Sequence, residues 1–283
     1  MTAHAFRLVN VFAEAPLAGN PLCVFEDGRG LDDATMQALA LQFNLSETTF
    51  VLPSSQASAR VRIFTPTFEM PFAGHPTLGT AHVVRALAGG GDHVTLEMKA
   101  GVIPVEAQGD VWTLQANAPT HRRPAASRAE LAAMLGLREE DVLADSLWVD
   151  TGSEQLLIPL ASVDAVDRAV PDAVLMQRYG SNATRAMAYV FARDGSASDR
   201  RIRARFFFPK HAAVLEDPGT GSACANLGGW FLATGTALPV RLDVHQGDQV
   251  GRPCRLGLEV TSDRRIRVSG RVVEIARGVV ELG

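Results

Sequence analysis

Cysteine is scarce in this chain, and its three cysteines, Cys23, Cys224 and Cys254, are far apart and form no C-x-x-C pair. A disulfide framework or a thiolate zinc site needs cysteines that are paired or closely spaced, so neither is predicted. The sequence also has no H-E-x-x-H pair, no paired acidic loop, no G-x-x-x-x-G-K-[ST] loop and no G-x-G-x-x-G turn. We therefore expect no metal site and no nucleotide site.

An excess of basic charge is also missing, because Lys and Arg number 27 against 31 for Asp and Glu. A net charge of −4 gives no general attraction for nucleic acid, which we do not expect as a partner. No window reaches ~18 apolar residues without charge, and the first residues show no basic region followed by an apolar run. We expect no membrane segment and a cytoplasmic protein.

The length of 283 residues and the apolar fraction of 47% favour two domains with substantial cores. Runs of alternating apolar residues predict mostly antiparallel strands, and two nearly apolar segments predict buried helices. Prolines and charges at 118–124 interrupt this pattern, so the predicted lobes are 1–118 and 119–269, with segment 270–283 free to return to the first. The fold class is α+β.

The two apolar helices open alike, with Gly74-His75 in the first half and Gly221-Ser222 in the second. This repetition suggests an internal duplication. The first N–H groups of a helix lack intrahelical partners and carry the positive end of its dipole, which suits an anion. The alternative for each segment is a core helix that follows a glycine-rich turn.

Glu47 lies in Asn44-Leu45-Ser46-Glu47-Thr48-Thr49, where turn residues lead into a β-branched strand. A carboxyl at the start of a strand that enters the core loses solvent, and desolvation raises its pKa toward the range useful for proton transfer. The alternative is an exposed acidic residue in a loop.

A Ser-His-Asp hydrolase could be assembled formally from Ser222, His75 and Asp217. The sequence has no G-x-S-x-G elbow, and we expect the Ser222 hydroxyl to cap its helix rather than attack a substrate. Proton transfer fits better, since it needs a positioned acid or base and donors that hold an anionic substrate.

Four segments together resemble the PhzF-like phenazine biosynthesis isomerase family: Val9-Asn10-Val11-Phe12 with Gly19-Asn20-Pro21, Ser46-Glu47-Thr48-Thr49-Phe50, Met70-Pro71-Phe72-Ala73-Gly74-His75-Pro76-Thr77-Leu78-Gly79, and Glu216-Asp217-Pro218-Gly219-Thr220-Gly221-Ser222-Ala223. They occur in the family's order and span most of the chain. The resemblance implies a fold similar to diaminopimelate epimerase, with two pseudo-symmetric lobes. Each lobe would be a mainly antiparallel, barrel-like sheet around a central apolar helix, and the active site would lie in a cleft between them.

The resemblance also implies a reaction, the isomerisation of trans-2,3-dihydro-3-hydroxyanthranilate without a cofactor, and a homodimer. Glu47 would be the general acid/base, with His75, Asp217 and Ser222 as polar partners. The substrate, a small cyclic or unsaturated carboxylic acid, would bind at the two helix openings, to Gly74, His75, Thr77, Thr220, Gly221 and Ser222.

Epimerases of this fold use two cysteines, one at each helix opening, as opposed acid and base. Here Ala73 precedes the first opening, and Cys224 lies too far along the second helix, so a two-thiol mechanism is not expected and Cys224 is predicted to pack in the core. The alternative function is a noncatalytic member of the fold that binds a small acid or another protein.

Overall fold

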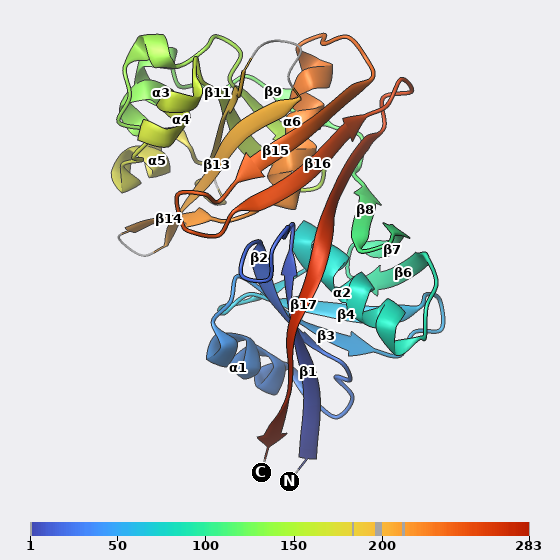
Figure 1. Ribbon diagram of the computed structural model, residues 1–283. Helices are drawn as coiled ribbons and strands as arrows, with labels where there is room; N and C mark the ends of the chain where they lie inside the picture. Colours follow the sequence, from blue (N-terminus) through green and yellow to red (C-terminus); the bar gives the residue numbers. More distant parts are fainter. Residues whose placement is uncertain (1, 183, 196–199, 211–212, 283) are drawn as a thin grey trace. The chain divides into compact units, whose positions relative to one another are not determined.

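The computed structural model describes residues 2–182, 184–195, 200–210 and 213–282. The chain divides into two compact units (Figure 1). Unit 1 comprises Met1–Gln115 and Ser269–Gly283, and unit 2 comprises Ala116–Val268.

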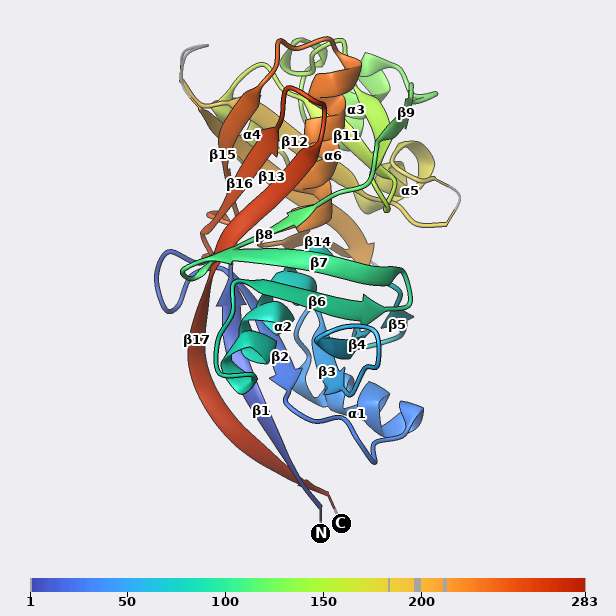
Figure 2. The same ribbon diagram turned by 90° about the vertical axis from the view of Figure 1, so that its right-hand side faces the viewer.

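Unit 1 is a curved sheet with one helix inside it and one outside (Figure 2). Its elements are β1 (Thr2–Val11), β2 (Asn20–Phe25), α1 (Asp33–Phe43), β3 (Thr48–Leu52), β4 (Ala59–Phe64), β5 (Glu69–Met70), α2 (Gly74–Leu87), β6 (His93–Met98), β7 (Gly101–Gln108), β8 (Val111–Gln115) and the later part of β17 (Ile266–Leu282). β1 pairs with β2 and with β17, and β17 also pairs with β8, so the sheet closes on itself.

Unit 1 contains both antiparallel and parallel strand pairs. The runs predicted as antiparallel, now β6, β7 and β8, are antiparallel as expected. The pairs β2–β3 and β4–β6 are parallel, and a parallel pair needs a long crossover connection. The helices α1 and α2 supply these two crossovers, which explains why helices interrupt the strand pattern.

The two helices of unit 1 differ in burial. α2 is buried from Gly74 to Ala81, as expected for an apolar helix that a sheet surrounds. α1 begins after Asp32, whose side chain accepts from the Thr35 N–H and so caps the helix. It packs Met36, Leu39 and Ala40 against aromatic side chains of β2, β3 and β4.

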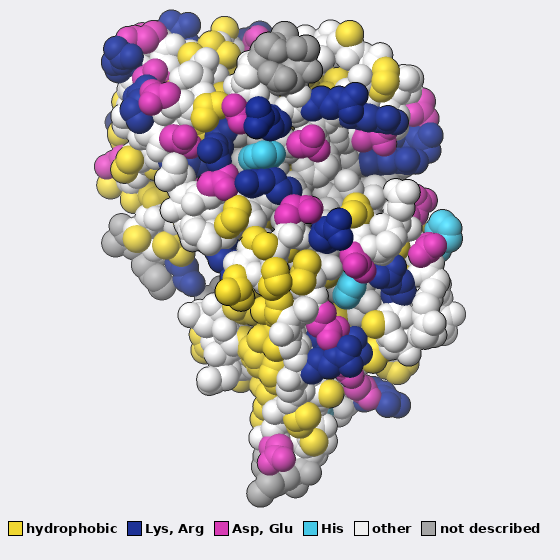
Figure 3. Space-filling view, viewed as in Figure 1, with side chains coloured by type: hydrophobic (Ala, Val, Ile, Leu, Met, Phe, Trp, Pro, Cys, Tyr) yellow, Lys and Arg dark blue, Asp and Glu magenta, His cyan; other side chains and the backbone are white. Residues whose placement is uncertain are grey.

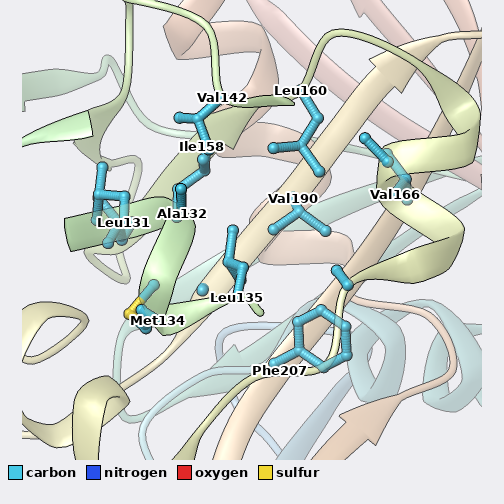
Figure 4. Close-up of a cluster of buried hydrophobic side chains, with 14 of the residues drawn as sticks. Leu131, Ala132, Met134, Leu135, Val142, Ile158, Leu160, Val166, Val190 and Phe207 are labelled. Atoms are coloured by element: carbon cyan, nitrogen blue, oxygen red, sulfur yellow. The ribbon is translucent and has the colours of Figure 1, made fainter. Parts of the chain in front are cut away.

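Unit 2 has the elements β9 (Thr120–Arg122), α3 (Arg128–Met134), a 3₁₀ turn (Glu139–Asp141), β10 (Leu147–Asp150), β11 (Gln155–Pro159), α4 (Val163–Arg168), α5 (Ala173–Tyr179), β12 (Ala188–Arg193), β13 (Arg201–Lys210), β14 (Ala213–Asp217), α6 (Gly221–Ala233), β15 (Val240–Gln246), β16 (Cys254–Val260) and the start of β17. Ser127 and Glu130 form a capping box at the start of α3. The short helices pack on one side of β11 and β12 around Leu131, Ile158 and Val190 (Figure 4).

The strand pairings of the two units follow one pattern, as the internal duplication requires. β10–β11 is antiparallel, β11–β12 parallel, β12–β13 antiparallel and β13–β15 parallel, which repeats β1 through β6. Each of the hairpins β4–β5 and β13–β14 leads into the central helix. In unit 1, Ile63 of β4 is the cross-strand partner of Thr49 in β3 and of Met70 in β5. In unit 2, Phe206 of β13 is in the same way the partner of Tyr189 in β12 and of Asp217 in β14.

α6 contains Gly228 and Gly229 in its middle, where glycine costs about 1 kcal/mol relative to alanine. A Cβ at Gly228 would lie 2.8 Å from Ile266 Cγ2, and one at Gly229 would lie 2.7 Å from Val149 Cγ1. The two glycines therefore allow α6 to approach the surrounding side chains more closely than residues with a Cβ would.

Several short or terminal elements differ from the sequence expectation. β5, β9 and β14 were not predicted, because strands of a few residues give little alternation. β17 continues past Ile275 to Leu282 because its end pairs with Thr2–Leu8 of β1. Along this strand Ile275 and Val279 are 40% and 58% exposed, and Figure 3 shows apolar side chains gathered there. No helix in the described part of the chain is long and apolar enough to span a membrane.

Candidate active site

The opening of α2 presents main-chain donors without a side-chain cap. Its N-cap is Ala73, so the N–H groups of Ala73, Gly74 and His75 precede the first intrahelical bond, and Pro76 has no N–H. Thr77 is fully buried, and its hydroxyl donates to the Ala73 carbonyl at 2.7 Å. Gly74 and His75 therefore present main-chain N–H groups at this opening, and the Thr77 side chain is bonded to the residue that precedes them.

Glu47 lies beside this opening. It directly precedes β3, as predicted, and its side chain is 15% exposed. Its Oε2 lies 3.4 Å from Nε2 of His75, whose side chain is 7% exposed. Strand β3 and helix α2 are also joined beneath the site by a buried contact of 2.8 Å between the hydroxyls of Thr49 and Thr80. The carboxyl group and the imidazole are thus held together by packed elements.

His75 is uncharged at neutral pH. Burial lowers its pKa to about 3, and a hydrogen bond to the Pro21 carbonyl offsets only part of this effect. A carbonyl can only accept, so the ring donates an N–H to Pro21. Nδ1 lies 3.4 Å from Nδ2 of the Asn20 amide, a group that can only donate, and Nε2 faces the Glu47 carboxyl.

The opening of α6 in unit 2 is organised by Asp217 and Gln246. Thr220 is the N-cap residue, and its side chain does not cap the helix but donates to Asp217 Oδ2 at 2.5 Å. Gln246 is fully buried; it accepts from the Thr220 N–H at 3.3 Å and donates to the Asp217 carbonyl at 2.9 Å. Gly221 and Ser222 are the first two helical residues, so their N–H groups have no intrahelical acceptor.

Ser222 does not cap α6, which corrects the sequence expectation. It is the second helical residue, and its Oγ accepts from Gln155 Nε2 at 2.9 Å. Gln155 Oε1 in turn accepts from Asn226 Nδ2 at 2.8 Å, and Asn226 is one turn along α6 on the same face. The hydroxyl is therefore held by a buried amide instead of the helix backbone.

The duplicated fold is not duplicated in chemistry. Thr49 and Tyr189 occupy corresponding register positions, so Glu47, two residues before the first, corresponds to Met187, two residues before the second. Methionine has no proton to transfer. Unit 1 therefore provides the acid/base candidate, while the opening in unit 2 provides polar groups only.

Sequence reasoning brought forward the residues at both openings but missed the amides that hold them. Asn20, Gln155, Asn226 and Gln246 are all buried and polar. Asn226 could have been found, because it is one turn after Ser222 in an otherwise apolar helix. The other three are single polar residues at strand ends, where the alternation of apolar and polar residues does not indicate that they are buried.

The three cysteines are buried and free, so the predicted packing role of Cys224 is confirmed. Burial raises the pKa of each thiol far above its usual value, which makes them poor acids and bases at neutral pH. Within the described residues no group of three or more His, Cys, Asp or Glu side chains could hold a metal ion.

A surface pocket of about 370 Å³ lies at the far end of α6, lined by His121, Arg122, Arg123, Asp145, Leu147, Ala233 and Thr234. The helix is 13 residues long, so this pocket is roughly 18 Å from Ser222. Arg122 already donates to Glu154 at 2.7 Å and lies over the Trp148 ring. We assign the chemistry to the polar groups at the helix openings.

Comparison with known proteins gives one consistent result. The model of the phenazine biosynthesis-like protein family, PhzC-PhzF, matches residues 9–278. An uncharacterised isomerase of Pasteurella multocida is 38% identical over 98% of this chain and 94% of its own length. The trans-2,3-dihydro-3-hydroxyanthranilate isomerase of Pseudomonas aeruginosa is 35% identical over 97% of this chain and 98% of its own. The crystal structure of a PhzF-family phenazine biosynthesis protein of Bacillus anthracis superposes with a TM-score of 0.88 at 26% identity, covering all of both chains.

Proposed function

Since the chain belongs to the PhzC-PhzF family of phenazine biosynthesis-like proteins and is an isomerase, we propose that it moves a proton within a small cyclic or unsaturated carboxylic acid, with Glu47 as the general acid/base. The observation that carries the proposal is the 3.4 Å approach of Glu47 Oε2 to the Nε2 of an uncharged histidine.

The pair is suited to carry one mobile proton. A charged histidine would hold Glu47 as a carboxylate by ion pairing, whereas neutral His75 adds no positive charge next to the carboxyl. Without a neighbouring cation on His75, Glu47 can act as the base that accepts the proton and then as the acid that delivers one.

The proton balance of the reaction is simple. The Glu47 carboxylate removes a proton from a C–H bond next to the unsaturated system, and the electron pair of that bond shifts the double bond. Glu47, now a carboxylic acid whose side chain is 15% exposed and whose proton can exchange with solvent, then delivers a proton to another carbon. No atom or electron is gained or lost overall, so the step needs no oxidant and no cofactor.

The helix openings would bind the acid. The N–H groups at Gly74 and His75 in α2 and at Gly221 and Ser222 in α6 are oriented at the positive ends of helix dipoles. Each opening can hold a carboxylate or another polar group of the acid, and in unit 2 Asp217, Thr220 and Ser222 would contact those groups. Substitutions in each unit test this assignment separately.

The substrate class follows from the relatives. Because one relative is named a trans-2,3-dihydro-3-hydroxyanthranilate isomerase, that acid and related cyclic dienes are the first candidates.

The proposal also includes a homodimer, for which the exposed apolar side chains Ile275 and Val279 supply surface. Light scattering on the purified protein tests it, and a monomeric mass at working concentration would remove it.

The experiment for the activity is incubation with a panel of cyclic and unsaturated carboxylic acids in D₂O, followed by proton NMR. Conversion of one acid into an isomer carrying deuterium supports the proposal. Binding by calorimetry without conversion of any acid would favour the noncatalytic acid-binding alternative instead.

A further inference from the structure

The orientation of the Asn226 side chain in α6 is fixed by two main-chain groups. Its Oδ1 lies 2.9 Å from the N–H of Thr151, which can only donate. Its Nδ2 lies 2.8 Å from the carbonyl of Ser153, which can only accept. Rotating the amide by half a turn would place donor against donor and acceptor against acceptor, and Asn226 is fully buried, so no water could compensate.

The fixed Asn226 amide in turn fixes Gln155. The second N–H of Asn226 Nδ2 points to Gln155 Oε1 at 2.8 Å, so the oxygen of Gln155 must face α6 at this point. Its Nε2 is therefore the group 2.9 Å from Ser222 Oγ, and it donates. Gln155 is 3% exposed, and the same burial argument excludes the reversed amide.

The last member, Ser222, is left with a free O–H. Its oxygen accepts from Gln155, and no described residue accepts its proton. Ser222 is only partly buried, so this proton is available to a ligand. A hydroxyl has one proton and two lone pairs; here Gln155 occupies one lone pair and cannot take the proton, so the proton is directed away from Gln155.

We propose that Asn226 and Gln155 are positioning residues that keep the Ser222 hydroxyl from donating to Gln155 and so orient its proton toward the ligand, which favours a ligand oxygen, carboxylate or carbonyl, at this position. The proposal rests on the proposed function, because it assigns Ser222 to the substrate site. It adds a reason why the site prefers an acid at this point. The N–H of Thr151 and the carbonyl of Ser153 fix the Asn226 amide, which fixes the Gln155 amide and, through it, the Ser222 hydroxyl.

The test is a double-mutant cycle on the binding of anthranilate, an aromatic acid that cannot isomerise. Gln155→Met keeps the side-chain length but removes the donor, so Ser222 is free to turn its proton away from the ligand. We expect about tenfold weaker binding by calorimetry, the loss typical of one hydrogen bond to a charged group. In the Ser222→Ala background, Gln155→Met should change the affinity by less than about twofold, because its effect passes through the hydroxyl.

Asn226→Asp provides a second variant if Gln155→Met does not fold. The introduced carboxylate has no N–H for Gln155 Oε1, so Gln155 turns over and accepts from Ser222. Anthranilate binding should again fall about tenfold. Any repulsion of the acid by the new charge persists in the Ser222→Ala background, while the positioning effect disappears there.

Gln37→Met is the matched control, because Gln37 donates to the Thr65 carbonyl in unit 1 and lies outside the proposed site. It should leave anthranilate binding unchanged. An equal loss with and without the Ser222 hydroxyl would overturn the positioning role, as would no loss at all or no binding by the unmodified protein. Deuterium incorporation from D₂O during turnover of trans-2,3-dihydro-3-hydroxyanthranilate tests the proposed function separately. If deuterium is incorporated but the double-mutant cycle shows no coupling, only the positioning role of Asn226 and Gln155 is contradicted.

Discussion

Glu47 Oε2 lies 3.4 Å from His75 Nε2, and the histidine is kept uncharged by burial. The two residues are brought together by different elements, the turn before β3 and the first turn of α2. A neutral imidazole next to a carboxyl leaves the proton of the pair free to move, which is the physical basis of the proposed isomerase chemistry.

The neutral state of His75 makes stability depend on pH. Its folded pKa of about 3 is below the ordinary value of 6.5, so below pH 6.5 the unfolded chain binds a proton that the folded protein does not. The stability is complete above pH 6.5 and is lost as pH falls toward 3, by up to about 1.4 kcal/mol per pH unit. His75→Gln should remove this part of the slope in denaturant titrations between about pH 7 and pH 5.

Exposed His93 provides the control for this titration, and His93→Gln should leave the slope as it is in the unmodified protein. An unchanged slope in His75→Gln would show that the histidine is charged in the folded state.

A buried ion-pair cluster stabilises unit 1 away from the site. Arg7 is 5% exposed and donates to Glu26 at 2.6 Å and to Glu274 at 2.9 Å. Arg7→Met would leave Glu26 and Glu274 close together without the arginine that both contact, while Glu274 keeps its bond from Arg277. We expect a loss of about 2–3 kcal/mol in unfolding free energy, moderated by the partial exposure of the two carboxylates. The exposed pair of Arg29 with Asp27 is the comparison, and Arg29→Met should have almost no effect on denaturant midpoints. Equal effects of the two substitutions would contradict this prediction.

Asp217 separates a role in activity from a role in stability. Asp217→Asn retains an oxygen that can accept from Thr220 Oγ1, so the opening of α6 should keep its shape and its thermal midpoint. The charge is lost, and we expect kcat/KM to fall roughly 10–100-fold. Asp243→Asn, at an exposed position of β15, should change neither quantity. Full activity of Asp217→Asn would remove this residue from the site.

The central helices and their openings could be predicted because they depend on local composition. Gly74 and Gly221 each precede a run of small apolar residues, and such a run needs a surrounding sheet wherever it occurs. Glu47 could be placed at a strand start for the same reason, since the change from turn residues to β-branched residues is local.

The partners of these groups could not be predicted, because they depend on register. The position of β3 against α2 decides whether Glu47 contacts His75. The parallel pairing of β2–β3 and β4–β6, which the helical crossovers produce, cannot be inferred from the alternation of apolar and polar residues along each strand. The cap role assigned to Ser222 failed for this reason. The competing donor, Gln155, is on a strand far away in sequence and becomes a neighbour only through the fold.

Solvent deuterium incorporation by Glu47→Gln is the most direct test of the central claim. In D₂O the unmodified protein should isomerise trans-2,3-dihydro-3-hydroxyanthranilate, or another acid of the class, and the product should carry deuterium at the new C–H bond. Glu47→Gln should lower the rate about 10²–10⁴-fold. Glu97→Gln, which alters a half-buried carboxyl that accepts from Ser54, should leave it unchanged. Turnover and labelling by Glu47→Gln at the rate of the unmodified protein would contradict the account.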